Sequence, residues 1–165
     1  MTTDEHTDEE ESTGYEKAFR WELDFRLNVG ETDRRFFEGL KEKRILGNRC
    51  SESGNTYVPP QPYCDEAFVE PDEWIEAGPE AVLESYTVTF RQFRNMPEPP
   101  YVNGAIRVGE SDTCFLHFVG GVDYDEPEDL IDAFESGMRV RPVWRDEREG
   151  DILDIKYFEP VEEHV

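Results

Sequence analysis

Two cysteines stand where the first thiols of two Cys-x-x-Cys pairs would stand. Cys50 and Cys64 lie in the turn-rich stretch RCSESGNTYVPPQPYC, and Ser53 and Ala67 occupy the second position of each pair. Four thiolates at such a spacing close a tetrahedron around Zn²⁺, whereas two cannot complete that shell. Neighbouring carboxylates could add oxygen ligands, but such a structural site would be unusual. We therefore expect the remnant of a zinc knuckle, with no zinc and no other cofactor.

The third cysteine and one histidine lie in a second stretch, TCFLHF, whose composition predicts a strand. Alternation along it places Cys114 on the same face as Leu116 and Phe118, and we expect a buried thiol in the core. His117 falls on the opposite face. A histidine without a nucleophile or carboxylate at a recognisable spacing is more often structural than catalytic. The sequence shows no catalytic constellation, so we predict no catalytic residue.

Basic residues concentrate in one stretch of an otherwise acidic chain. Six of the 17 lysines and arginines fall within sixteen residues, and they are Arg34, Arg35, Lys41, Lys43, Arg44 and Arg49. A positive patch of this kind would attract anions. The alternative is a solvated helix face whose bases pair with acids on the same helix.

A second candidate ligand site surrounds the proline-rich stretch MPEPPYV, which would connect two strands. Arg91 and Arg94 precede this stretch, and Tyr101 lies within it. Loops in such positions flank the binding face of small barrels. Together with the basic stretch, these residues could hold the phosphates of a molecule of the size and charge of coenzyme A, or contact a partner protein. Simple pairing of Arg91 and Arg94 with surface acids is the alternative.

The elements that must position these residues fall into four segments. Residues 1–14 are acidic and are predicted to be a disordered tail. Residues 15–47 combine an extended arm, FRWELDFRLNV, with an amphipathic helix, because the apolar period changes from two to the helical spacing. Residues 48–69 form the knuckle, which is too short to hold a core of its own. Residues 70–165 contain a series of short strands.

The helix and the strands have recognisable boundaries. Thr32 or Asp33 would cap the helix and Gly47 would stop it. Its apolar face would hold Phe36, Phe37 and Leu40. From WIEAG to ILDIKYFEPV, short runs of β-branched and aromatic residues alternate with turns, and EPEDLIDAFESGM interrupts them as a short helix ending at Gly137. This order predicts a mainly β chain with a small Greek-key OB-fold barrel, preceded by the arm, the helix and a rubredoxin-like knuckle. A sandwich is the alternative.

The charge of the chain limits its partners. With 40 acidic against 17 basic residues, the formal net charge is -23 at pH 7. Acids spread along the whole chain are typical of a cytoplasmic protein from a salt-loving microbe, and an ordinary acidic interaction protein is the alternative. Such a charge opposes nucleic-acid binding, because affinity for phosphate backbones comes mainly from lysine and arginine.

The chain has no apolar run long enough for a membrane span and no export signal. Its three cysteines, an odd number without framework spacing, fit a reducing compartment. We expect a cytoplasmic protein that binds neither nucleic acid nor membranes.

The order of motifs resembles a known family. FFEGLKEKRILGNRC, YVPPQPYC, ESYTVTFRQF, PPYVNGAIRV and SGMRVRPVW follow one another as in the zinc-ribbon-containing OB-fold proteins found beside thiolases in archaea and bacteria. The resemblance covers roughly residues 33–160. The family's four ribbon thiols correspond to positions 50, 53, 64 and 67, so the resemblance implies a haloarchaeal type of subunit with a degenerate zinc ribbon.

The resemblance also implies a function. Haloarchaeal proteins similar to this one accompany β-ketothiolases, in which the large subunit holds the catalytic cysteine and the small subunit supports activity or acyl-CoA transfer. We therefore expect a noncatalytic subunit of a thiolase-type acetyl-CoA C-acyltransferase complex, not itself an enzyme, which contacts its thiolase-like partner through the arm, the basic helix and the knuckle. Two alternatives remain: a module that binds single-stranded nucleic acid, and a stand-alone protein that binds coenzyme A thioesters.

Overall fold

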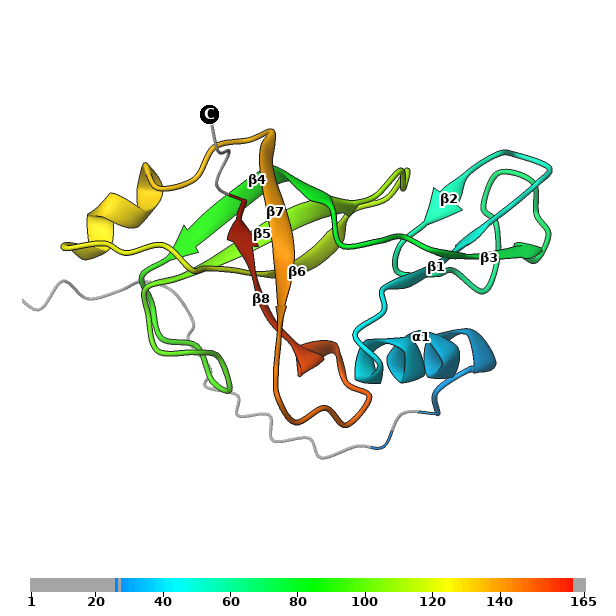
Figure 1. Ribbon diagram of the computed structural model, residues 1–165, viewed down its shortest axis with the longest axis horizontal. Coiled ribbons are helices and arrows are strands. Elements are labelled where there is room, and N and C mark those ends of the chain that lie inside the picture. The colour runs from blue at the N-terminus through cyan, green and yellow to red at the C-terminus, as the bar shows by residue number, and fades with distance from the viewer. Residues whose placement is uncertain (1–25, 27, 162–165) are drawn as a thin grey trace, which may run out of the picture.

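Figure 1 shows a computed structural model of the chain, which describes residues 26 and 28–161. The predicted acidic tail and residues 19–25 and 27 of the predicted arm lie outside the described residues. The described part is mainly β, as the sequence predicts. A closed five-stranded barrel is joined to a smaller three-stranded sheet and one α-helix. In this part of the chain, no helix is long and apolar enough to cross a membrane.

The chain first forms helix α1 (Glu31–Lys41) and then the smaller sheet. In this sheet, β1 (Leu46–Arg49) is central and pairs antiparallel with β2 (Thr56–Tyr57) and β3 (Glu73–Glu76). We call residues 46–76, with their connecting turns, the ribbon. The stretch WIEAG, which the sequence analysis groups with the barrel strands, supplies β3 and therefore belongs to the ribbon.

The barrel follows the ribbon. Its strands are β4 (Ala81–Thr89), β5 (Tyr101–Val108), β6 (Phe115–Val119), β7 (Met138–Trp144) and β8 (Ile155–Pro160). They close in the order β4-β5-β6-β8-β7, with β6 and β8 parallel and the other neighbours antiparallel. Two short 3-10 segments, η1 (Pro127–Ile131) and η2 (Ile152–Asp154), lie after β6 and before β8. This topology confirms the predicted OB-fold barrel and excludes the sandwich.

Helix α1 is anchored to the barrel through its apolar face. Phe36 and Leu40 are buried in the same core cluster as Phe115 and Ile155 of the barrel. The rings of Phe36 and Phe115 meet edge to face, with centroids 6.1 Å apart, a favoured arrangement for aromatic pairs. The predicted helix face is therefore the packed one, and Figure 1 shows α1 beside both the ribbon and the barrel.

The ends of α1 differ from the prediction. Gly30 is its N-cap, and within the described residues no side chain caps the first turn. Thr32 and Asp33, the predicted caps, lie inside the helix. Gly47 does not stop the helix but lies in β1, where a Cβ atom would come within 2.6 Å of the Tyr57 carbonyl oxygen. A glycine is needed there because β2 approaches β1 closely.

The second predicted helix is shorter than expected. Of EPEDLIDAFESGM only η1 is helical, and the chain from there to Gly137 is irregular. The Tyr86 hydroxyl lies 2.7 Å from the carbonyl oxygens of both Ile131 and Phe134. A side chain from β4 thus reaches carbonyls that a longer helix would pair with its own N–H groups, and Phe134 is buried in the core.

The predicted faces of β6 are inverted. Cys114 precedes the strand and is exposed, so the expected buried thiol is wrong. Leu116 is 75% exposed, whereas His117 is 6% exposed and faces inward with its neighbours Phe115 and Val119. The pairing partner of His117 is a glycine of β5 whose missing Cβ would point into the core. This register, set by the neighbouring strand, decides which face is buried.

Candidate functional site

The two ribbon cysteines lie in a small core of their own. Cys50 and Cys64 are fully buried beside Tyr57. Each cysteine opens a tight turn that a backbone hydrogen bond closes. The N–H of Gly54 donates to the Cys50 carbonyl at 2.8 Å, and the N–H of Phe68 donates to the Cys64 carbonyl at 2.9 Å. The two turns are therefore equivalent and bring both sulfurs into the same core.

The sulfur of Cys64 is surrounded by hydrogen-bond donors. The hydroxyls of Ser53 and Tyr57 lie 3.3 and 3.2 Å from Sγ, and the N–H of Ala67 donates to it at 3.4 Å. These hydrogen bonds, that of Ser53 first, lower the pKa of Cys64 to about 6. The hydrogen bond with Cys64 is also the main reason why the pKa of Tyr57 is raised to about 12. The donors around Cys64 therefore come from both turns and favour its thiolate form.

The ribbon residues do not fit the zinc that a complete four-thiol ribbon would hold. The Ser53 hydroxyl accepts from the N–H of Asn55 at 3.1 Å and contacts Cys64, so it is already engaged. Ala67 offers only its backbone amide. Among the described residues, no group of three or more His, Cys, Asp or Glu side chains could hold a metal ion. The donor set cannot close a tetrahedral shell, and the expectation of a metal-free ribbon stays a prediction.

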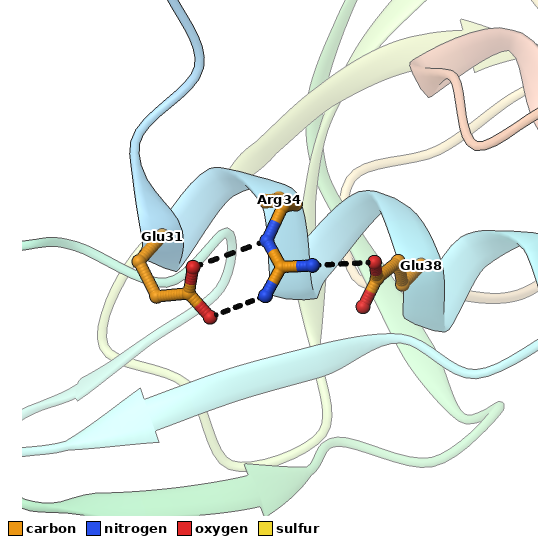
Figure 2. Close-up of polar contacts among 3 residues, drawn as sticks. All are labelled: Glu31, Arg34 and Glu38. Atoms are coloured by element: carbon orange, nitrogen blue, oxygen red, sulfur yellow. Dashed lines mark hydrogen bonds and ion pairs between the residues drawn. The ribbon is translucent and has the colours of Figure 1, made fainter.

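The basic residues of α1 are largely paired with acids. Arg34 lies between Glu31, at 2.7 Å, and Glu38, at 3.0 Å, along the exposed face of the helix (Figure 2). Arg44, after the helix, contacts Glu76 of β3 at 2.9 Å and also Glu42. Exposed pairs of this kind contribute little to stability, but they reduce the positive field that an anion would meet.

The other basic residues of this region have different surroundings. The guanidinium of Arg35 lies 4.2 Å from the ring centroid of Trp74. The carbonyl of Lys41 accepts a hydrogen bond from Arg148 at 2.8 Å. Lys43 adopts a positive φ of 63° in the turn after the helix, and Arg49 is exposed at the end of β1. The six residues therefore lie along α1 and its junction with the ribbon, where carboxylates accompany them.

The remaining predicted ligand residues lie elsewhere. Arg91 and Arg94 are exposed in the loop of residues 90–100 between β4 and β5, and the Arg91 guanidinium lies 5.9 Å from the Phe93 ring centroid. Tyr101 is buried at the start of β5, edge to face with Phe118. Figure 1 shows this loop away from α1, so the structure does not bring the two groups of basic residues together.

The loop between β4 and β5 also exposes apolar side chains. Phe90 and Phe93 are about half exposed, at 47% and 50%, and Met96 is 36% exposed. Arginines alternate with them in the sequence FRQFRNM. Aromatic residues, methionine and arginine are the types enriched in protein interfaces. Sequence reasoning singled out the arginines as anion ligands but missed the apolar residues, although their spacing in a turn was visible.

The barrel wall contains a cavity of about 380 Å³ between β4, β5, β6 and η2. His117 lines it together with Asn103, Leu116 and Leu153, among others. The Nε2 atom of His117 lies 3.0 Å from the carbonyl oxygen of Ile152 in η2. Burial lowers the pKa of His117 below its ordinary value, so the imidazole is neutral at neutral pH. The sequence pattern favours a structural role for this histidine and contains no signal for the cavity.

Comparison with known proteins supports the barrel assignment. Residues 74–145 match a family model described as the C-terminal OB-fold domain of ChsH2. No curated protein sequence matches the chain. Among solved structures, the chain is similar to an Ltp2-ChsH2(DUF35) aldolase, with a TM-score of 0.60 and 24% identity over 82% of this chain and 98% of that chain. A DUF35-family protein of unknown function from Sulfolobus solfataricus has a TM-score of 0.59 and 24% identity over 81% and 85% of the two chains. These structures share the fold of the chain.

One expectation from the sequence is corrected by this comparison. The sequence analysis predicts that the chain is not an enzyme. A structure of the same fold is an Ltp2-ChsH2(DUF35) aldolase, so this fold occurs as part of an enzyme, and the prediction is wrong in that form.

Proposed function

We propose that the chain is a subunit of an enzyme complex of thiolase or aldolase type that acts on coenzyme A thioesters. The observation that carries this proposal is the match to a chain of the Ltp2-ChsH2(DUF35) aldolase, which extends over 98% of that chain. This similarity extends beyond the barrel, because the family model of the OB-fold domain matches only residues 74–145. The motif order that resembles thiolase-associated proteins supports the same proposal independently.

The loop between β4 and β5 is the contact surface that the structure favours for the catalytic partner. It presents Phe90, Phe93 and Met96 with arginines between them. When a partner covers apolar side chains, each Å² of apolar surface removed from water contributes about 25 cal/mol of favourable free energy. The ribbon is a second candidate surface, because Phe68 in one of its turns is 70% exposed. The basic helix remains a candidate for contact with phosphates or with the partner.

The acidic composition suggests where this complex works. A net charge of -23 on 165 residues keeps a protein hydrated and monodisperse in concentrated salt. We place the complex in the cytoplasm of a salt-loving archaeon, as the resemblance implies. Experiments on it therefore belong in high-salt buffer, because self-repulsion at low salt would weaken both the fold and the assembly.

Affinity purification from the source organism tests the proposal. The tagged full chain, isolated in high-salt buffer, should bring with it an enzyme of thiolase or aldolase type. That enzyme should cleave or condense acyl-CoA thioesters in the presence of the chain and lose most of its activity without it. Recovery of the chain with no such enzyme, or an enzyme whose activity ignores the chain, would overturn the proposal.

Paired variants test the contact surface. Phe90→Ser with Phe93→Ser should reduce co-purification at least tenfold, because central aromatic residues dominate binding at most interfaces. Tyr124→Ser with Ile131→Ser is the matched control, since both side chains are exposed to a similar degree but lie beyond β6. Equal loss of partner in both variants would show that the loop is not the contact surface.

A further inference from the structure

The outer face of the barrel carries an open groove, which is the cavity of about 380 Å³ over β4, β5 and β6 that η2 borders. Strand pairing aligns its lining residues in two rows across the three strands. Ser85, Ala105 and Leu116 form one row, and Thr87, Asn103 and Phe118 form the other. In β5 and β6 these positions alternate with buried ones, so their side chains point away from the core. The groove therefore lies on the surface of the closed barrel.

The lining of the groove suits an extended apolar segment of polypeptide. Leu116 is 75% exposed and Leu153 of η2 is 39% exposed, so apolar surface is left in water. No lysine, arginine, aspartate or glutamate is among the lining residues, and no charged group there would attract an ion. The hydroxyls of Ser85 and Thr87 and the amide of Asn103 can pair with the backbone of an extended segment.

The chain itself contains a segment of this kind immediately before α1. In FRWELDFRLNV, residues 19–29, every second residue is apolar, from Phe19 to Val29. An extended conformation would place all of these side chains on one side. Val29, the last of them, is 48% exposed. The described part of the fold therefore leaves the end of this apolar row uncovered.

The arm, residues 19–29, begins close enough to the groove to reach it. The carbonyl oxygen of Phe37 in α1 lies 3.4 Å from the place that a Cβ atom on Gly150 would take, two residues before η2. Residues 31–37 rise by about 9 Å along the helix. An extended arm covers roughly 33 Å. In the view of Figure 1, the described residues 28–30 turn back beneath α1 in the direction of the barrel. The arm is therefore long enough to return past α1 and lie along the groove.

We propose that the arm docks in this groove of its own chain as an extended segment, with its apolar row against Leu116, Phe118 and Leu153. Docking removes both apolar surfaces from water. The covalent link gives the arm an effective concentration in the millimolar range, which favours it over a second copy of the chain. This contact within one chain differs from the partner contact that the sequence analysis expects for the arm, and it goes beyond the proposed function.

A spin label on a native cysteine tests the contact in the full chain. Cys114 is exposed, two residues before Leu116, whereas Cys50 and Cys64 are fully buried. A methanethiosulfonate nitroxide should therefore modify Cys114 alone. Its unpaired electron broadens the resonances of nearby amides. The amide signals of residues 19–27 should lose intensity in the labelled chain and recover it when ascorbate reduces the nitroxide.

Two variants of the arm separate docking from mere proximity. Trp21→Ser with Phe25→Ser removes apolar side chains from the row, and the remaining arm signals should recover their intensity. Glu22→Ser with Asp24→Ser is the matched control, because it changes the alternate positions of the same segment. The control should lose as much intensity as the wild type.

Two variants of the barrel test the groove itself. Leu116→Asp places a charge on an exposed lining position. It should reduce the ratio of docked to free arm at least about tenfold, because the docked arm would bury an unpaired charge. Tyr124→Asp is the control, since Tyr124 is exposed but does not line the groove. It should leave the broadening unchanged.

A mixed sample identifies the occupant. Chains enriched in ¹⁵N but without nitroxide are combined with nitroxide-labelled chains of natural isotope content. Arm signals should keep their intensity in this mixture, and broadening equal to that within one chain would show that a second copy fills the groove. That result, unbroadened arm signals in the labelled chain, or equal losses in the two arm variants would each overturn the proposal. All samples lack an enzyme partner, so failure here leaves the proposed complex untouched, and failure to co-purify an enzyme leaves the arm contact untouched.

Discussion

The environment of Cys64 shows how single side chains can hold the two turns of the ribbon together. A ribbon must hold two facing turns together, and a bound ion does this through thiolates contributed by both. Here Ser53 from the first turn, Tyr57 from β2 and the Ala67 amide from the second turn all contact the one sulfur. Hydrogen bonds to a charged group are stronger than neutral ones. The thiolate therefore links the turns as the centre of the network.

This network predicts a pH-dependent stability. The ordinary pKa of a cysteine thiol is 9.0, and in the fold that of Cys64 is about 6. A lowered pKa means that the stabilisation is fully present above pH 9, declines as the pH falls from 9 to 6, and is absent below 6. Tyr57→Phe removes one donor and should reduce the gain in stability between pH 6 and pH 9. Urea unfolding at several pH values in constant salt measures it.

The difference between wild type and variant isolates the contribution of Cys64. Other groups titrate equally in both proteins, and Tyr57 itself stays protonated in this window because its pKa is raised to about 12. Cys114→Ser serves as the control, since Cys114 is exposed and outside the ribbon. If Tyr57→Phe and wild type gain the same stability from pH 6 to pH 9, the thiolate network does not exist.

Among the elements, β6 shows what the sequence can and cannot predict. Its existence and its period of two followed from TCFLHF, but its inward face did not. Leu116 is more apolar than His117, so an apolar-in rule chooses the wrong face. The correct face depends on the register with β5, where Gly104 opposes His117. That pairing joins residues distant in sequence, and no local pattern contains it.

The basic helix shows the same division between local and non-local information. The clustering of its bases was visible in the sequence, and so were the acids on the same helix that pair with Arg34. The pairing of Arg44 with Glu76 depends on the contact between the helix junction and β3, 32 residues away. The separation of this helix from Arg91 and Arg94 likewise follows from the barrel topology. The sequence therefore predicted the composition of the candidate ligand residues better than their arrangement.

The ribbon as an element should hold zinc if two further thiols are introduced. Ser53 already points its hydroxyl at Cys64, 3.3 Å from the sulfur, and the turn at Ala67 is equivalent to the turn at Ser53. Ser53→Cys with Ala67→Cys should therefore create a tetrahedral site that binds stoichiometric zinc and raises the melting temperature in its presence. Metal analysis and the absorption spectrum of the Co²⁺ form would measure it.

The control for this experiment adds one thiol at another position of the ribbon and one in the barrel. Ser51→Cys with Ala105→Cys has the same composition, but Ser51 contacts Asp72 and Ala105 lies in β5. This variant and the wild type should both bind well under one zinc per chain. Stoichiometric zinc in the wild type would instead show that carboxylates complete the shell of Cys50 and Cys64, and the assignment of a metal-free ribbon would be wrong.

At the scale of the whole molecule, the dominant quantity is the net charge. The chain carries -23 on 165 residues, and such a charge destabilises a compact state through self-repulsion. Most ion pairs in the described part are exposed, as at Arg34 and Arg139, and exposed pairs add little stability. The closed barrel and its buried cluster must therefore offset a repulsion that depends on the solvent. Salt is the variable that sets the balance, because the Debye length falls from about 10 Å at 0.1 M to about 3 Å at 1 M.

The melting temperature should accordingly rise as salt increases from 0.1 M to 2 M, and the rise should depend on surface charge. Neutralising Asp123, Asp125 and Glu128, all exposed around η1, removes roughly a quarter of a repulsion that scales with the square of the net charge. Asp123→Asn, Asp125→Asn and Glu128→Gln together should raise the melting temperature at 0.1 M and make it less dependent on salt. The charge-preserving set Asp123→Glu, Asp125→Glu and Glu128→Asp should behave like the wild type. Calorimetry at matched pH measures the effect, and a melting temperature that falls with salt, or an equal rise in both sets, would show that surface repulsion does not limit this fold.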